Sequence, residues 1–350
     1  NTGIGFETAR IFAGKNSRVL LGCRSESKAQ LAISRIRDIH PLADLTWLPL
    51  DLADLNSIRA AASVAEESHL DILINNAAVM AVPQSLTKDG FEHQFGVNHL
   101  GHFALTGLLI KTLTARPGTR VVTVSSLAHR TGKIDFNDIA GVQSYSAMSR
   151  YQMSKAANLY FTLELHRRLI TANKSTLSVG CHPGIATTEI GRHFPTWLQL
   201  ITPIANPFFN SAAQGALPCL FAATSPSVRG MDYYGPTKRG ESVRSAGKAI
   251  IASHIMDETI ASRLWDLSVE LTGIEFKLPP GPVHLNFPFD EPLIPEKIEA
   301  IISPSITIKN MEKPEINFSI PTLKMAKTPI IIVGPMEGNT HEKELVQFGE

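Results

Sequence analysis

Over the first 273 residues of the chain, short apolar runs alternate with amphipathic stretches of helical length. The apolar runs are rich in Val, Ile and Leu, as strands that are covered on both faces require. Repeated alternation of this kind predicts an α/β fold, a doubly wound parallel sheet with helices on both sides. We predict strands at Arg18–Gly22, Leu45–Leu50, Ile72–Asn75, Arg120–Ser125, Leu177–His182 and Gly230–Tyr234. We predict helices at Glu26–Asp38, Leu55–Ser68, Gly90–Thr114, Tyr151–Thr171 and Asn210–Ala223.

The alternating pattern then stops, and we place a boundary there between a first region, 1–273, and a second region, 274–350. The second region begins with few helical patterns and with a Pro-rich run, Leu278–Pro282. A later apolar run, Thr328–Gly334, predicts one buried strand followed by a Gly-Pro turn. The second region is therefore expected to be an irregular C-terminal extension.

Composition narrows the class of protein. Hydrophobic residues make up 43% of the chain and charged residues 19%, which is typical of a soluble globular protein. A formal net charge of +1 gives no reason to expect nucleic acid as a partner. The three cysteines are far apart, which argues against a disulfide framework and for a reducing compartment. No apolar run reaches the roughly 18 residues of a spanning helix, so we predict a cytoplasmic location. Membrane association through an upstream segment is left open.

The chain opens with closely spaced glycines, Asn1-Thr2-Gly3-Ile4-Gly5. Such glycines let the backbone approach a pyrophosphate, whose charge favours the N-terminus of a helix, although an ordinary Gly turn has the same composition. A dinucleotide-binding loop should follow a strand, and no strand precedes this one. We therefore expect Thr2, Gly3, Ile4 and Gly5 to bind a cofactor in a sheet that lacks its first strand. Unpaired neighbouring strands would then weaken cofactor binding or cause aggregation.

Two further positions follow predicted strands at the edge where such sheets bind ligands. After the first of these strands, an acidic residue would hold the ribose of NAD, whereas an arginine accommodates the 2′-phosphate of NADP. Arg24 stands there, so the sequence favours NADP(H) over NAD(H). Asp51 and Leu52 follow the next strand and are expected to line the cofactor, although Asp51 is also a typical helix N-cap.

A phenol and an ammonium lie four residues apart in Tyr151–Lys155, on one face of a predicted helix. A free tyrosine has a pKa of about 10, which is too high for ready proton exchange near neutrality. A nearby cation favours the phenolate and lowers this pKa, so Tyr151 is a candidate general acid and base. Tyrosine and lysine at this spacing are common by chance. The residues around them therefore determine whether the pair indicates a catalytic site.

Polar residues, or glycine and proline, follow several of the other predicted strands. Asn75–Ala78 ends one strand, Ser125 and Ser126 end the next, and Pro183-Gly184 follows a third. Because parallel strands end at one edge of the sheet, these residues are expected to surround a ligand crevice. Asn98 lies between the first two, within a predicted helix.

This ordered set resembles the short-chain dehydrogenase/reductase family over residues 1–273. The segments Val97–Phe103, Val124–His129 and Tyr151–Asn158 are most similar to its retinol dehydrogenase-like branch, which typically uses NADP(H). The resemblance implies a Rossmann-like fold and an enzyme that interconverts an alcohol and a carbonyl by hydride transfer. The cofactor would supply the hydride chemistry, and the protein would supply orientation and proton transfer.

The resemblance also implies individual roles. Tyr151 would exchange the proton on the substrate oxygen, and Lys155 would bind the nicotinamide ribose and lower the tyrosine pKa. Ser126 would hydrogen-bond the reacting carbonyl, and Asn98 would hold a water that links the lysine to solvent. The remaining cofactor contacts would be Asn75 and Ala77 on the adenosine side, and Pro183, Gly184 and Thr188 on the nicotinamide side.

An apolar segment, Gly191–Phe209, lies where the family covers its substrate. It implies a lipophilic alcohol, aldehyde or ketone, while core packing, a homo-oligomer contact or a membrane surface would use the same composition. His99, His102 and His182 lack the spacing of a ligand set, so we predict no metal.

Part of the extension has no counterpart in this family. Residues 281–293 and 330–336 resemble parts of SEPHCHC synthase, the thiamine-diphosphate enzyme of menaquinone biosynthesis. The diphosphate-binding motif of such enzymes is absent from the chain, so the extension is expected to be a fragment, through either a true fusion or a chimeric gene model. A piece of a thiamine enzyme and a noncatalytic nucleotide-binding module are therefore the alternative functions. The combination of Asn98, Ser126, Tyr151 and Lys155 argues against the noncatalytic module.

Overall fold

The computed structural model describes residues 1–185, 210–278 and 329–333. Within these residues, eight strands form one sheet in the order β2-β1-β8-β3-β4-β5-β6-β7. Neighbouring strands are parallel except for the antiparallel pair β6 and β7. The strands are β1 Arg18–Cys23, β2 Leu45–Pro49, β3 Ile72–Asn75, β4 Arg120–Val124, β5 Leu177–Cys181, β6 Tyr233–Lys238, β7 Val243–Lys248 and β8 Pro329–Val333.

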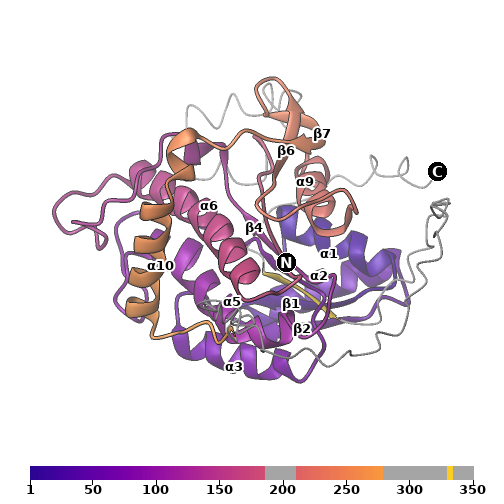
Figure 1. Ribbon diagram of the computed structural model, residues 1–350. Helices are drawn as coiled ribbons and strands as arrows, with labels where there is room; N and C mark the ends of the chain where they lie inside the picture. Colours follow the sequence, from indigo (N-terminus) through magenta and orange to yellow (C-terminus); the bar gives the residue numbers. More distant parts are fainter. Residues whose placement is uncertain (186–209, 279–328, 334–350) are drawn as a thin grey trace, which may run out of the picture. The chain divides into compact units, whose positions relative to one another are not determined.

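Helices cover both faces of this sheet (Figure 1). Because side chains alternate along a strand, Leu20 and Leu73 pack on one face and Leu21 and Ile74 on the other. The first face is covered by α3 Leu55–Glu66, α5 Gly101–Leu113, α6 Ala147–Thr171 and α10 Glu258–Thr272. The second face is covered by α1 Gly3–Gly14, α2 Glu26–Ile39 and α9 Ala212–Thr224. The predicted doubly wound α/β sheet is confirmed.

The structure refines two of the predicted helices. The segment expected to be one helix over Gly90–Thr114 is α4, His93–Phe95, followed by a π-helical turn, Gly96–Leu100, and α5. Gly101 lies where a Cβ would come within 2.7 Å of the Leu52 carbonyl oxygen, so glycine permits a close approach there. Helix α6 starts earlier than predicted, because the Ser146 side chain caps it by accepting a hydrogen bond from the backbone N–H of Ser149.

The last predicted strand is displaced along the chain. Gly230–Tyr234 was expected, but β6 begins at Tyr233 because Met231 has a positive φ of 68° and turns the backbone before it. β7 was not predicted, since its sequence is largely polar. It pairs antiparallel with β6 around a turn in which Arg239, Gly240 and Glu241 all have positive φ.

The central position of the sheet is filled from the far end of the chain. β8 lies between β1 and β3 and is parallel to both, with Ile331 opposite Leu20 on one side and Leu73 on the other. The strand predicted at Thr328–Gly334 is therefore confirmed. The expectation of a sheet with an open position beside β1 and β3 is corrected, because β8 satisfies the hydrogen bonds of both neighbours.

Two short 3-10 helices complete the described elements, η2 Leu127–Arg130 and η4 Ser253–Met256.

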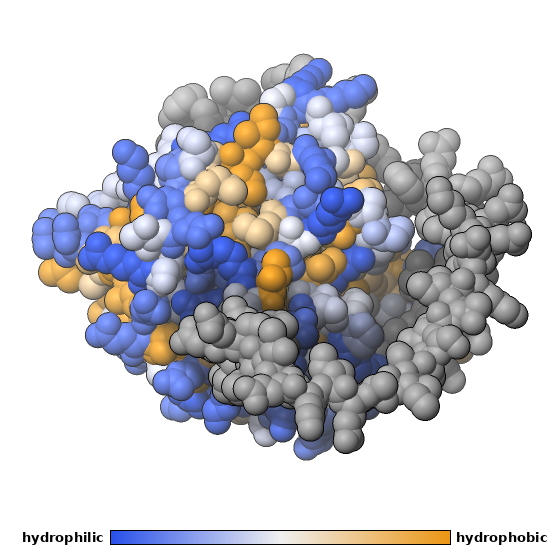
Figure 2. All heavy atoms as spheres, in the orientation of Figure 1, coloured by the Kyte–Doolittle hydropathy of each residue, from blue (hydrophilic) through white to orange (hydrophobic). Residues whose placement is uncertain are grey.

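The face drawn in Figure 2 is mainly hydrophilic, with hydrophobic areas between the polar ones. Among the described residues, large exposed apolar side chains include Leu42 at 93% and Val142 at 80% exposure. No helix in the described ranges combines the length and the apolar character that crossing a membrane requires.

Candidate active site

A pocket of about 210 Å³ lies at the carboxyl ends of β3, β4 and β5, next to the first turn of α1. Its walls bring together segments that are far apart in the sequence. They consist of Thr2, Gly3, Ile4, Gly5, Asn76, Ala78, Met80, Val124, Ser125, Ser126, Leu127, Tyr151, Lys155, Pro183, Gly184 and Ile185.

The first wall is the N-terminus of α1. Thr2 is its N-cap residue, in extended conformation, and Gly3 has a φ of 54°. A residue with a side chain would be strained at Gly3, so glycine is what lets the chain turn into the helix at this point. The backbone N–H groups of a first helical turn have no partner within their own helix, and the helix dipole favours negative charge there. This wall suits a phosphate group.

The opposite wall comes from the end of β4. Ser125 is buried, and its hydroxyl donates a hydrogen bond of 2.7 Å to the carbonyl oxygen of Lys155. Ser126 has extended backbone and caps η2, since its Oγ accepts a hydrogen bond of 3.2 Å from the Ala128 N–H. Both serines line the pocket, and the first also fastens the end of β4 to α6.

Helix α6 contributes a phenol and an ammonium to the same pocket. Lys155 is only 1% exposed, and its Nζ donates a hydrogen bond of 3.1 Å to the Val124 carbonyl oxygen. The same Nζ lies 5.8 Å from the centre of the Tyr151 ring. Asn158, one turn further along, also donates to the Val124 carbonyl at 3.1 Å. The end of β4 and the middle of α6 are therefore bound together, and Ser126, Tyr151 and Lys155 line one pocket.

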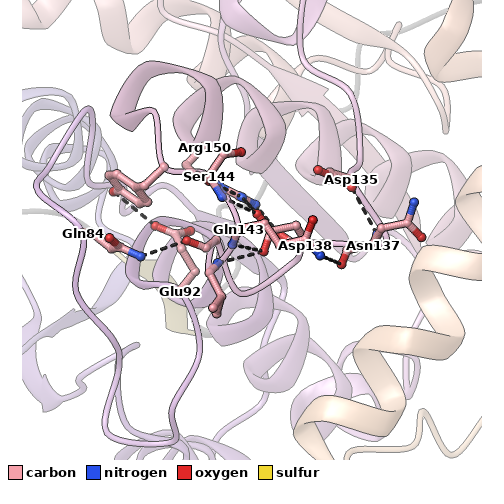
Figure 3. Close-up of polar contacts among 11 residues, drawn as sticks. Gln84, Glu92, Asp135, Asn137, Asp138, Gln143, Ser144 and Arg150 are labelled. Carbon is pink, nitrogen blue, oxygen red and sulfur yellow. Dashed lines mark hydrogen bonds and ion pairs between the residues drawn. The ribbon is translucent and has the colours of Figure 1, made fainter.

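A buried ion pair holds the start of α6 from outside the pocket (Figure 3). Arg150, the residue before Tyr151, donates to the Asp138 carboxylate at 2.7 Å and to the Ser144 carbonyl at 2.9 Å. The Asp138 carboxylate also accepts hydrogen bonds from the backbone N–H groups of Val142, Gln143 and Ser144. The loop before α6 is thereby tied to the helix directly beside Tyr151.

Asn98 binds the backbone of the segment that follows β3. It is fully buried, its Oδ1 accepts a hydrogen bond of 2.8 Å from the Val79 N–H, and its Nδ2 donates to the Val79 carbonyl at 2.8 Å and to Ser154 Oγ at 2.9 Å. Asn98 is not part of the pocket wall. Its side chain instead holds the segment after β3, which carries Asn76 and Ala78 to the pocket.

Known proteins that are similar to this chain identify its family. A family model described as short chain dehydrogenase matches residues 1–199. Retinol dehydrogenase 12 of Mus musculus is 42% identical over 281 residues, which cover 79% of this chain and 85% of that protein. The chain belongs to the short-chain dehydrogenase/reductase family.

Further relatives agree with this assignment. Retinol dehydrogenase 11 of Homo sapiens is 41% identical and matches 78% of this chain and 84% of its own length. A crystal structure of an uncharacterized protein from Mycobacterium paratuberculosis is 38% identical, with a TM-score of 0.67, and the match covers 79% of this chain and 92% of that one. This short-chain dehydrogenase/reductase is thus a retinol dehydrogenase-like oxidoreductase. None of these matches supports the resemblance of the extension to a thiamine-diphosphate synthase.

Most of the residues expected at the dehydrogenase site lie in the pocket, and several do not. Asn75 is fully buried and donates hydrogen bonds to Thr106 and Thr123, on the side of the sheet that faces α5. Its neighbour Asn76 lines the pocket instead, because consecutive residues point in opposite directions. Ala77 belongs to the hydrophobic core in the same way.

Three expected cofactor contacts lie elsewhere along the same edge. Arg24 is exposed at the end of β1. Leu52 is part of the core, and the Asp51 carboxylate accepts a hydrogen bond from the Ala53 N–H, as a turn residue does. Thr188 and the apolar segment Gly191–Phe209 lie outside the described residues.

Sequence reasoning missed several apolar residues of the pocket wall. They flank the predicted motifs by one or two positions, so proximity to a motif was the only signal that could have found them. They are Met80, Val124, Leu127 and Ile185.

The three histidines considered as metal ligands are buried. Burial is the main cause that lowers the pKa of His99, His102 and His182 to about 3. They therefore stay neutral at physiological pH. His99 Nε2 is hydrogen-bonded to the Ser268 hydroxyl on α10, and His102 Nδ1 donates to the Asn98 carbonyl one turn earlier, so both rings have structural contacts.

Proposed function

We propose that this short-chain dehydrogenase/reductase interconverts a lipophilic alcohol and its carbonyl with NADP(H), and that Tyr151 is the general acid and base. The observation that carries the proposal is that Ser126, Tyr151 and Lys155 line one pocket together with the N-terminus of α1. A pocket for binding alone has no need for a phenol, an ammonium and a hydroxyl grouped beside a phosphate-binding turn.

The donor groups of the pocket fit a nicotinamide dinucleotide. The first turn of α1 suits its pyrophosphate, and the glycine with positive φ at position 3 permits a close approach of the backbone. Pro183 and Gly184 lie near Tyr151 and Lys155 in the wall and would border the nicotinamide. When bound, the cofactor supplies or accepts the hydride.

Side chains of the protein would then orient the substrate carbonyl and transfer the proton. Ser126 would donate a hydrogen bond to the substrate carbonyl, which orients it and favours negative charge on the oxygen. Tyr151 would deliver its phenolic proton to the same oxygen during reduction and take it back during oxidation. Lys155 would favour the phenolate form of Tyr151 by its positive charge and hold the nicotinamide ribose.

The preference for NADP(H) and the lipophilic substrate are each supported by a separate observation. Arg24 is exposed at the end of β1, where a guanidinium would pair with the 2′-phosphate of NADP. The relatives are named retinol dehydrogenases, and retinol is a lipophilic alcohol. The apolar residues Ala78, Met80, Leu127 and Ile185 in the wall suit such a substrate.

The test is a pair of tyrosine substitutions on one helix. Tyr151→Phe removes the proposed acid and base, and we expect it to lower kcat by about 100-fold or more while NADPH binding persists. Tyr160→Phe removes a hydroxyl from the same helix, where it donates to the His254 carbonyl outside the pocket. We expect this control to keep kcat within about twofold, since it touches no reacting group. The assay is turnover of a panel of lipophilic aldehydes, with cofactor binding followed by fluorescence titration. A Tyr151→Phe enzyme that keeps the kcat of the unchanged protein would contradict the proposal.

A further inference from the structure

The backbone of Ser126 is held by more than the sheet. Its carbonyl oxygen accepts a hydrogen bond of 3.1 Å from the His129 N–H and one of 2.6 Å from His129 Nδ1. The Tyr233 hydroxyl reaches the same oxygen at 3.4 Å. A carbonyl that accepts several hydrogen bonds is fixed in direction, and with it the peptide plane that follows Ser126.

The hydrogen bonds of His129 define its tautomer. The Ala252 backbone N–H, which can only donate, points at Nε2 from 3.3 Å. Nε2 must therefore be the acceptor, and the proton sits on Nδ1, where it is donated to the Ser126 carbonyl. The ring is completely buried, and this burial lowers the pKa of His129, so the neutral form is the one present.

The His129 ring is also held by contact with an aromatic neighbour. It packs edge-on against the Tyr233 ring, with the ring centres 5.3 Å apart and the planes at 85°. Tyr233 begins β6, and Ala252 lies just before η4. The ring therefore connects the serine to two segments that follow residue 230 in the sequence.

We propose that His129 is a positioning residue for Ser126: its Nδ1–H fixes the serine carbonyl so that the hydroxyl faces Tyr151. This inference rests on the proposed function, in which Ser126 orients the reacting carbonyl. Small errors in the placement of such a group reduce the rate of the chemical step far more than they reduce binding. His129 does not line the pocket, so it acts only through Ser126.

Two amide substitutions of His129 distinguish the role of Nδ1 from that of Nε2. In His129→Asn the side-chain amide lies where Nδ1 was, so donation to the Ser126 carbonyl can persist. In His129→Gln the amide reaches the position of Nε2, so the contact with the Ala252 N–H persists and the one with Ser126 is lost. We expect kcat within about threefold of wild type for His129→Asn, and about a tenfold loss for His129→Gln. The Kd for NADPH should be unchanged in both. Equal losses of kcat in the two variants would overturn the inference.

A double-mutant cycle supplies the second readout. If His129 acts through Ser126, His129→Gln should lower kcat about tenfold alone and by less than about twofold in a Ser126→Ala background. The same tenfold loss in both backgrounds contradicts the inference. Should His129→Gln fail to fold, Tyr233→Phe removes the other side-chain donor, and we expect about a threefold loss that likewise vanishes beside Ser126→Ala.

The cycle also separates this inference from the proposed function. An enzyme in which Ser126→Ala keeps full activity contradicts both, because the serine would then have no role. An enzyme that is impaired by Ser126→Ala but not by His129→Gln contradicts only the role of the histidine.

Discussion

The two sides of the pocket are built in different ways. The catalytic side, with Ser126, Tyr151 and Lys155, comes from the end of β4 and from α6, between which the chain forms only η2 and a loop. The cofactor side, with the first turn of α1, is next to β1 and β8, and β8 lies more than 300 residues along the chain from that turn. The main elements of the catalytic side are near neighbours in the sequence, although Ser126 also contacts Tyr233. The cofactor side depends on a pairing between strands that are more than 300 residues apart.

Because of this difference, we expect substitutions on the two sides of the pocket to have different effects on the protein. On the catalytic side, β4 and α6 are joined by direct hydrogen bonds between Ser125 and Lys155 and between Lys155 and Val124, so a disturbance stays local. On the cofactor side, the loss of β8 would leave β1 and β3 with unpaired backbone groups along their whole length. We therefore expect substitutions in β8 to act on the whole fold and substitutions around α6 to act on catalysis.

The largest effect is expected from a proline in β8. Ile331 pairs with β1 on one side and with β3 on the other. Ile331→Pro removes a backbone donor from the middle of a sheet, so we expect a loss of about 3 kcal/mol or more in the free energy of unfolding, and loss of NADPH binding. Ile331→Val keeps the backbone donor and a β-branched residue that suits a strand, so it is the matched control and should bind NADPH as the unchanged protein does. Urea unfolding and cofactor titration measure both. Normal binding by the proline variant would show that β8 is not the central strand.

A smaller effect is expected on the catalytic side, at the ion pair beside Tyr151. Asp138→Asn leaves the buried Arg150 guanidinium without its counter-charge, and we expect a loss of about 3 kcal/mol in stability. Below the unfolding temperature, kcat should fall several-fold while the Kd for NADPH stays constant, since α1 is not touched.

The matched control for this pair is an exposed one. Lys88 is 70% exposed and pairs with Asp54, so Lys88→Gln should leave both the thermal stability and kcat nearly unchanged. Thermal unfolding and steady-state kinetics give both quantities. A weakened cofactor affinity in Asp138→Asn would mean that the two sides of the pocket are not independent.

The same division explains what the sequence could predict. The alternation of apolar runs predicted the doubly wound sheet, and the ordered motifs predicted that Ser126, Tyr151 and Lys155 belong to one site. β8 was predicted as a strand but not placed in the sheet, because local patterns carry no information on long-range pairing. The largely polar β7 was missed for lack of an apolar pattern.

Single positions within motifs were the hardest to predict. Asn75 and Asn76 are identical in type, and only the direction in which the strand ends decides which of them faces the pocket. Asn98 was expected to hold a water that links the lysine to solvent; that its side-chain amide is hydrogen-bonded to both backbone groups of Val79 could not be read from the sequence. The contacts of His129 with Tyr233 and Ala252 join residues more than 100 positions apart, and no spacing in the sequence indicates them.

The smallest predicted effect tests the cofactor side without disturbing its fold. Arg24 is exposed at the end of β1, so Arg24→Ala should leave stability unchanged. A charge-assisted contact with a 2′-phosphate at an exposed site is worth about 1 kcal/mol, so the Kd for NADPH should rise about fivefold while the Kd for NADH stays the same. Arg18→Ala removes the same charge from the opposite end of β1 and should change neither constant. Because Arg24 does not line the pocket around Tyr151, kcat at saturating cofactor should also be unaffected. An equal weakening of NADPH and NADH binding would show that Arg24 acts by general attraction and not by recognising the 2′-phosphate.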